Sequence, residues 1–240
     1  MEHLSFDIEI SDEFDVQPGE DLAQYGPFHI SVAATVESGG DSRLWYSAGD
    51  GGVPARSMDQ GKARELLAYL AQMQKDGCKL FAWNGLGFDL RWIGYNADDM
   101  ETAAGVALGL YDPMFQFFNR RGFPVGLAAV AEAMGVRQVK LMDSADAPRE
   151  WNKGNYQRVM DYVAGDCQIT NQVVDAIARR KSVSWRTRKG TVSSEPMPRF
   201  KTVAEVLREP EPDQSWMVGG GLRRGKFIEW LPAHLLASAR

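Results

Sequence analysis

The stretch that decides the fold is Leu4–Ile10 (LSFDIEI), near the start of a chain of 240 residues. Apolar and polar residues alternate along it, which is typical of a β-strand with two different faces. On such a strand Asp7 and Glu9 point to the same side, about 7 Å apart at a rise of roughly 3.3 Å per residue. Carboxylates held side by side repel each other unless a cation lies between them, and their oxygens suit Mg²⁺ or Mn²⁺. A solvated acidic strand face would show the same pattern, so the pair needs partners elsewhere in the chain.

Further elements around this strand define the fold class. His29–Val36 (HISVAATV) and Arg43–Ser47 (RLWYS) predict two more strands joined by a glycine-rich turn, which favours an antiparallel meander. Asp59–Lys75 has an apolar face at helical spacing and predicts an amphipathic helix. The apolar run Lys79–Trp83 then predicts a strand parallel to the first. The order β-β-β-α-β predicts an α/β fold, in which a mixed sheet is flanked by helices.

A second stretch with chemical potential lies where that last strand ends, at Trp83–Asp89 (WNGLGFD). Two glycines at a strand-to-helix turn allow close backbone approach, and Asp89 is expected to open the following helix. Helix capping alone would account for Asp89, although it does not explain Asn84 and the glycines before it. The carboxyl end of a strand in an open α/β sheet is where ligands usually bind.

The middle of the chain is less informative. Residues 97–135 predict helices with breaks at Pro113 and Pro124, and Asp112 is interpreted as a turn or cap residue and not as a ligand. The polar stretch Lys140–Gly154 predicts a loop.

The third stretch is a long helix predicted over Asn155–Arg180. Tyr162 and Asp166 lie four residues apart on it, so they share one face with Cβ atoms about 5–6 Å apart. Tyr46–Asp50 and Tyr95–Asp99 have the same spacing, but one runs off a strand into a turn and the other follows Asp89 too closely to form a separate wall of a site. A surface tyrosine over a charged face is the simpler alternative for Tyr162.

Composition indicates an ordinary globular protein, with 44% apolar and 25% charged residues. No apolar run approaches the roughly 20 residues of a membrane span, and the first residues do not have the pattern of a signal peptide. Two cysteines, Cys78 and Cys167, are too few for a disulfide scaffold. We therefore expect a cytoplasmic protein that does not associate with a membrane.

The charge is unevenly distributed. Residues 176–240 hold 13 Lys and Arg against 6 Asp and Glu, whereas residues 1–175 hold 14 against 26. Basic residues gather at 179–189 and again at Arg223, Arg224 and Lys226. An acidic body with a basic tail fits a metal site beside a polyanion track, and it equally fits a solvated surface without a partner.

Taken together, the three stretches resemble the DEDD superfamily of 3′–5′ exonucleases, in its tyrosine branch, which includes the proofreading domains of family B DNA polymerases. The Asp-x-Glu motif of that family matches Asp7 and Glu9, and its Asn-x-x-x-Phe-Asp motif matches 84–89. Its Tyr-x-x-x-Asp motif matches Tyr162 and Asp166. The resemblance covers residues 1 to about 180 and implies a ribonuclease H-like exonuclease domain there. Residues 181–240 are then expected to be a small basic C-terminal extension packed on this core.

The resemblance also implies roles for these residues. Four carboxylates, those of Asp7, Glu9, Asp89 and Asp166, would hold two ions of Mg²⁺ or Mn²⁺. Tyr162 would orient the attacking water and not remove its proton, because a phenol with a pKa near 10 is a poor base at neutral pH.

Substrate contacts are expected from Asn84, Phe88 and Ile10. Phe88 would pack or stack on the terminal nucleotide, although an ordinary core phenylalanine explains it as well.

The implied function is removal of nucleotides from the 3′ end of single-stranded DNA, with RNA as a possible substrate. A polymerase domain does not fit in 240 residues. Proofreading for a separate polymerase and work with a repair or recombination protein therefore remain open. A catalytically inactive ribonuclease H-like module that binds nucleic acid is the alternative, although such a module would have no need of mutually repelling acids. The basic tail would bind the nucleic acid backbone or, alternatively, another protein.

Overall fold

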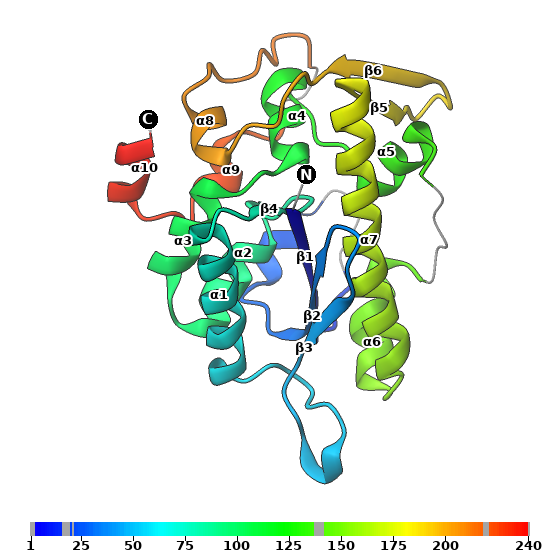
Figure 1. Ribbon diagram of the computed structural model, residues 1–240, viewed down its shortest axis with the longest axis vertical. Coiled ribbons are helices and arrows are strands. Elements are labelled where there is room, and N and C mark those ends of the chain that lie inside the picture. The colour runs from blue at the N-terminus through cyan, green and yellow to red at the C-terminus, as the bar shows by residue number, and fades with distance from the viewer. Residues whose placement is uncertain (1–2, 16–19, 21, 137–141, 218–220, 240) are drawn as a thin grey trace.

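A four-stranded mixed sheet lies at the centre of the protein (Figure 1). The computed structural model describes residues 3–15, 20, 22–136, 142–217 and 221–239. The strands are ordered β3-β2-β1-β4, with β2 antiparallel to β1 and β3, and β4 parallel to β1. Their bounds are β1 His3–Ile10, β2 Ile30–Glu37, β3 Ser42–Trp45 and β4 Lys79–Phe81. The predicted order and directions of these strands are confirmed.

The two faces of the sheet bury different sets of side chains. On β1, Phe6, Ile8 and Ile10 lie in the larger core together with the first helices. The alternate residues of β1 face the other way, where β2 contributes Val32 and Ala34 to a second core. Because β1 and β2 pair in register, Glu9 lies opposite Val32 and Asp7 opposite Ala34. The two acids therefore lie on the face of the second core.

Three helices cover the first face, namely α1 Gln60–Lys75, α2 Asp89–Ala97 and α3 Met100–Gly109. The helix α1 begins where predicted, because the Asp59 side chain accepts a hydrogen bond from the Lys62 backbone N–H at 2.9 Å and so caps it. Its apolar stripe, including Leu66 and Leu70, is fully buried. These helices make one wall of the molecule, to the left of the sheet in Figure 1.

The second face is covered by α7 Tyr156–Arg180, the long helix that the sequence predicted. Its residues Val159 and Val163 pack against β2 in the second core. The segment predicted as a loop at 140–154 contains a helix instead, α6 Ala147–Asn152, and Lys140 lies outside the described residues. That prediction was wrong because Trp151, fully buried against α7, fixes a local helix in a polar sequence. No helix in the described part of the chain combines the length and apolar character needed to cross a lipid bilayer.

The helices predicted over 97–135 continue after α3 as α4 Pro113–Arg121 and α5 Leu127–Met134. Pro113 is the first residue of α4, where a missing N–H costs nothing. Asp112 caps this helix, since its Oδ1 accepts from the Phe115 N–H at 3.0 Å, which confirms its interpretation as a cap. Short 3₁₀ helices occupy Leu22–Tyr25, Asp50–Gly52 and Ser144–Asp146.

The described part of the chain after α7 forms a hairpin and short helices. These are β5 Ser182–Arg186, β6 Val192–Pro196, α8 Val203–Leu207, α9 Gly225–Ile228 and α10 Ala233–Ala239. Phe227 and Leu231 belong to the larger core of the sheet, and Trp185 joins a third core with α4, α5 and α7. The segment therefore packs on the body through apolar contacts. The predicted domain boundary near residue 180 remains a prediction.

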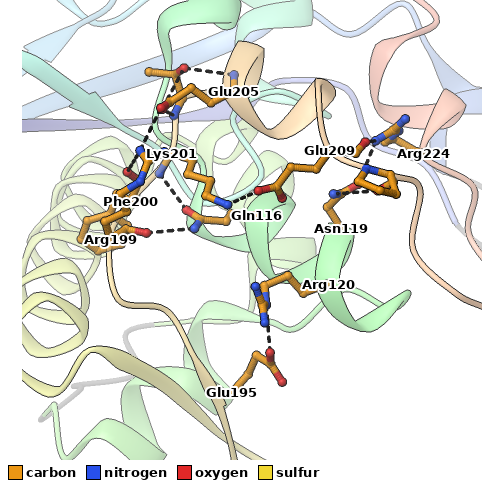
Figure 2. A network of polar contacts seen from close by, with 12 residues as sticks. Gln116, Asn119, Arg120, Glu195, Arg199, Phe200, Lys201, Glu205, Glu209 and Arg224 are labelled. Atoms are coloured by element: carbon orange, nitrogen blue, oxygen red, sulfur yellow. Dashed lines mark hydrogen bonds and ion pairs between the residues drawn. The ribbon is translucent and has the colours of Figure 1, made fainter. Parts of the chain in front are cut away.

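Polar contacts fix this C-terminal segment to α4 (Figure 2). The buried Gln116 amide bridges two backbone groups, donating to Arg199 O and accepting from the Lys201 N–H, both at 3.0 Å. Arg120 holds Glu195 of β6 at 2.9 Å. The Gln116 amide thus forms both a donor and an acceptor hydrogen bond with the backbone, as a neighbouring strand does. These two bonds hold the segment at a defined place on α4.

One expectation for the tail needs correction. Arg224 does not belong to a basic surface cluster, because its side chain is buried and bonded to Asn119 Oδ1 at 3.1 Å and Glu209 O at 2.8 Å. Trp216 in the same segment is 59% exposed. The exposed cations of this region include Arg188 and Lys189 at the turn of the hairpin.

Candidate active site

The strand β1 presents Asp7 and Glu9 to the face of the sheet that α7 covers. Glu9 is 8% exposed, while Asp7 keeps part of its surface in solvent. Ser5, two residues before Asp7 on the same face, donates a hydrogen bond from Oγ to Cys167 O of α7 at 2.8 Å. This contact fixes the height of α7 along β1, and Cys167 directly follows Asp166.

Asp89 reaches the same place from the start of α2. Its Oδ1 accepts a hydrogen bond from the backbone N–H of Ile8, between the two acids of β1, at 3.1 Å. The Asp7 and Asp89 side chains interact with each other, and burial raises the pKa values of both carboxyl groups.

The fourth carboxylate comes from α7. Tyr162 donates a hydrogen bond to the Asp166 side chain one helical turn away, and both residues are partly exposed. The charge of Asp166 acts on both Asp7 and Glu9. The structure therefore brings together the four carboxylates and the tyrosine that the sequence predicted as site residues.

The electrostatics of this group are unfavourable without a cation. Burial, and then the charges of the other site carboxylates, raise the pKa values of Asp7 and Glu9 well above their ordinary values. Burial raises the pKa of Asp89 to about 7 against the opposing effect of its hydrogen bonds, and it also raises the pKa of Asp166. Burial and the neighbouring acids move the pKa of Tyr162 further above its usual value of 10.0, so its hydroxyl stays protonated.

The turn before α2 is held by an acid that sequence reasoning had treated only as a cap. Besides capping α4, Asp112 accepts hydrogen bonds from the backbone N–H groups of Asn84 at 3.2 Å and Leu86 at 3.1 Å. Asn84 has a positive φ of 70°, a conformation that asparagine tolerates. A side chain at Gly85 would lie 2.5 Å from the Ala82 Cβ atom, which explains the glycine there. Asp112 is thus a positioning residue for the turn that delivers Asp89.

The three predicted substrate contacts lie in different surroundings. Asn84 and Phe88 are partly exposed and line a pocket together with residues of α2 and α9. Ile10 is 7% exposed and packs in the larger core. The sequence analysis did not single out Arg91, which lines the same pocket. Its position on α2, two residues after Asp89, is the feature that could have identified it.

The two other tyrosine–aspartate pairs have different surroundings. Tyr95 is 45% exposed, and Asp99 caps α3 by accepting a hydrogen bond from Thr102 N–H at 3.0 Å. Tyr46 is 37% exposed, and Asp50 begins a 3₁₀ helix. Both pairs are explained by local structure.

The donor set suits a hard divalent cation, since it consists of buried carboxylates that repel one another. Among the residues that the structure describes, no three His, Cys, Asp or Glu side chains are already arranged around one point as metal ligands. Asp7, Glu9, Asp89 and Asp166 are the groups that would hold such a cation.

Comparison with known proteins gives a likeness at the level of structure but not of sequence. No family model matches the sequence, and no curated protein matches it. The structure is similar to part of the family B DNA polymerase from the hyperthermophilic archaeon Pyrobaculum calidifontis, with a TM-score of 0.50 and 19% identity. The chain shares a fold with part of that polymerase. The likeness covers 75% of this chain and 24% of the polymerase chain, so this protein spans about a quarter of that relative.

Proposed function

We propose that this protein is a metal-dependent 3′–5′ exonuclease with a ribonuclease H-like fold, which removes nucleotides from single-stranded DNA. The observation that carries the proposal is the convergence of Asp7, Glu9, Asp89 and Asp166 from three separate elements. Such a group of mutually repelling acids destabilises the protein unless it binds cations. The likeness to part of a family B DNA polymerase supports a link to nucleic acid.

Each protein group has a defined part in the reaction. Asp7, Glu9, Asp89 and Asp166 would hold two ions of Mg²⁺ or Mn²⁺, with Glu9 and Asp166 toward the attacking water and Asp89 toward the leaving 3′-oxygen. Two bound ions supply an activated water and neutralise charge on the phosphate.

Tyr162 positions the water and does not act as a base. Its hydroxyl keeps its proton at any physiological pH because burial and nearby acids raise its pKa. It can therefore donate one hydrogen bond, now given to Asp166, and accept one from a water molecule. Asn84 and Phe88 would contact the end of the strand from the turn before α2.

Cleavage of labelled single strands tests the proposal. In Mg²⁺, a 5′-labelled strand should yield a ladder of progressively shorter products, and a 3′-labelled strand should release a labelled mononucleotide at once. DNA and RNA strands of the same sequence, assayed side by side, identify the substrate. Binding to either strand without cleavage in Mg²⁺ or Mn²⁺ would contradict the proposal and favour an inactive nucleic-acid-binding module.

A matched control is available in the chain. Glu195→Gln removes a carboxylate that is as buried as that of Glu9. Glu195 is not one of the candidate site residues, because it forms ion pairs with Arg120 and Arg121. Asp7→Ala should lose cleavage, while Glu195→Gln should retain it. A partner polymerase or repair protein would be sought only after cleavage is established.

A further inference from the structure

A cavity of about 360 Å³ lies at the edge of the sheet formed by β4. Lys79, the first residue of β4, lines this cavity and pairs with His3 on β1. Since a strand rises about 3.3 Å per residue, this level of the sheet is about 13 Å from Asp7 along β1. Ala178 lines the cavity from α7, and it lies about 18 Å beyond Asp166 along the helix. The cavity is therefore separate from the candidate active site.

Three aromatic residues from different segments line the cavity. The Phe81 ring of β4 stacks on the Tyr111 ring with centroids 5.2 Å apart, and it meets the Phe200 ring edge to face at 5.0 Å. Phe81 is fully buried, whereas Tyr111 and Phe200 keep part of their surface in solvent. The exposed parts of these two side chains offer a surface on which a planar ring can pack.

The segment 197–200 lines the cavity and is held from two sides. The Met197 N–H donates to Lys181 O at 2.9 Å, which joins the segment to the end of α7. The Gln116 side chain of α4 donates to Arg199 O at 3.0 Å (Figure 2). Met197 itself is buried in the third core. The cavity is therefore a formed feature of the fold.

The charged residues that line the cavity are all basic. They are Lys79, Lys181 and Arg199, from three separate segments, and no acidic residue is among the described residues of the lining. Arg199 Nη1 pairs with Glu205 of α8 at 2.8 Å, outside the lining. Lys181 is exposed and has no ion-pair partner within the part of the chain that the structure describes. An anion in the cavity thus meets positive groups without repulsion from a carboxylate of the lining.

We propose that this cavity is a second ligand site, which binds a small molecule in which a planar ring carries a phosphate group, such as a nucleoside monophosphate. The ring would pack beside Tyr111 and Phe200, and the phosphate would be held by Lys181 and Arg199. The contact of Arg199 with Glu205 uses Nη1, and the guanidinium has further N–H groups that suit a phosphate. The inference goes beyond the exonuclease proposal and does not depend on it.

The size of the cavity supports a ligand of this kind. Its volume lies at the lower end of the range of about 300–1,000 Å³ that is usual for small-molecule sites. The cavity therefore suits one nucleotide and not a longer strand.

Calorimetric titration in EDTA tests the site with three probes, namely dAMP, deoxyadenosine and inorganic phosphate. The wild type should bind dAMP more tightly than either of the others, because only dAMP reaches both the rings and the cations. No heat of binding with dAMP, or equal affinities for dAMP and inorganic phosphate, would contradict the proposal.

Two variants separate the parts of the ligand. Lys181→Gln should weaken binding of dAMP roughly 2- to 5-fold and leave deoxyadenosine unaffected, because it removes only a cation. Phe200→Leu should weaken binding of both dAMP and deoxyadenosine, roughly 2- to 10-fold, because it removes a ring. Lys181→Gln changes an exposed side chain, so the test does not depend on the folding of Phe200→Leu.

A matched lysine controls for general charge effects. Lys62 lies in the first turn of α1, at the end of that helix away from β4, and does not line the cavity. Lys62→Gln should bind dAMP as the wild type does, and an equal loss in Lys62→Gln and Lys181→Gln would overturn the proposal. A dAMP affinity that responds to Asp7→Ala but not to Lys181→Gln would place the nucleotide at the carboxylates and would also overturn it.

Discussion

Glu9 and Glu195 are buried to the same extent, each 8% exposed, but they have opposite surroundings. Glu195 meets Arg120 at 2.9 Å and Arg121 at 3.4 Å, so its charge is compensated within the protein. Burial, and then the charges of Asp166 and Asp89, raise the pKa of Glu9. Glu195 is thus part of a structural ion pair that fixes β6 to α4. For Glu9 we propose that divalent cations supply the compensating charge.

The largest difference between these two regions is expected in activity. Asp7→Ala removes the acid that faces all three others, and the loss of several kcal/mol of transition-state stabilisation corresponds to a decrease of roughly 100- to 10,000-fold. Single-turnover cleavage of a 3′-labelled strand measures this directly, with Glu195→Gln as the control. Full activity in Asp7→Ala would show that these carboxylates do not form the active site.

The second difference concerns stability and pH. The pKa of Asp89 is about 7 in the folded protein and 3.8 as its reference value, so the unfolded chain loses this proton first as the pH rises. The unfolded state is thereby favoured, and the free energy of unfolding of the metal-free protein should fall, by on the order of 2–4 kcal/mol, between about pH 4 and pH 7. Urea denaturation in EDTA at several pH values measures this slope.

A neutral isostere isolates this effect. Asp89→Asn can keep the hydrogen bond from Ile8 N–H through its Oδ1 and can donate to Asp7 through its amide. It should therefore be more stable than the wild type at pH 8 in EDTA, and less sensitive to pH. Cleavage should be lost at the same time. A wild type that gains stability from pH 4 to pH 7 would contradict the raised pKa values.

Tyr162 should show a smaller effect on activity. If its hydroxyl only orients a water molecule, Tyr162→Phe removes one positioning hydrogen bond and slows the chemical step by on the order of 10- to 100-fold, with DNA binding in Ca²⁺ nearly unchanged. Asp166→Ala, its hydrogen-bond partner, should be more severe. Single-turnover rates for both variants give the comparison. Equal rates for Tyr162→Phe and the wild type would make Tyr162 a surface residue without a part in the reaction.

The smallest effect is expected where charge is already compensated. Glu195→Gln leaves two half-exposed arginines with weaker partners, and hydrogen bonds to charged groups contribute about 1.5–3 kcal/mol in general. Because both arginines are half-exposed, their hydrogen bonds contribute less than this. We therefore expect the free energy of unfolding to fall by about 1 kcal/mol. Thermal or urea unfolding measures it.

Local periodicity predicted most of the sheet, whereas the grouping of the four carboxylates and Tyr162 into one site was implied by the resemblance and stays a prediction. The alternation of β1 fixes which face Asp7 and Glu9 share, and the four-residue spacing on α7 fixes that of Tyr162 and Asp166. Contacts between segments that are far apart in the sequence cannot be predicted from local periodicity. Asp112 holds a backbone N–H group 28 residues away, at Asn84.

The same limit explains the errors in the tail and before α7. Arg223 and Arg224 are adjacent and chemically identical, and only the packing of α9 on α4 decides that Arg224 is the buried one. Likewise, the polar sequence around Trp151 forms α6 because the indole ring is buried in the core formed by β2 and α7. Neither outcome follows from composition or spacing.

The central claim is that the carboxylate group is completed by divalent cations, and calorimetric titration with Mn²⁺ tests it most directly. Burial raises the pKa values of Asp7, Glu9 and Asp89, so cations that bind there should displace protons. Titrations near pH 6.5, in two buffers of different ionisation enthalpy, should therefore show binding of two ions with release of at least one proton per chain. Binding should be lost in Asp7→Ala and kept in Glu195→Gln. A wild type that binds no Mn²⁺, or one that binds it as Asp7→Ala does, would contradict the account.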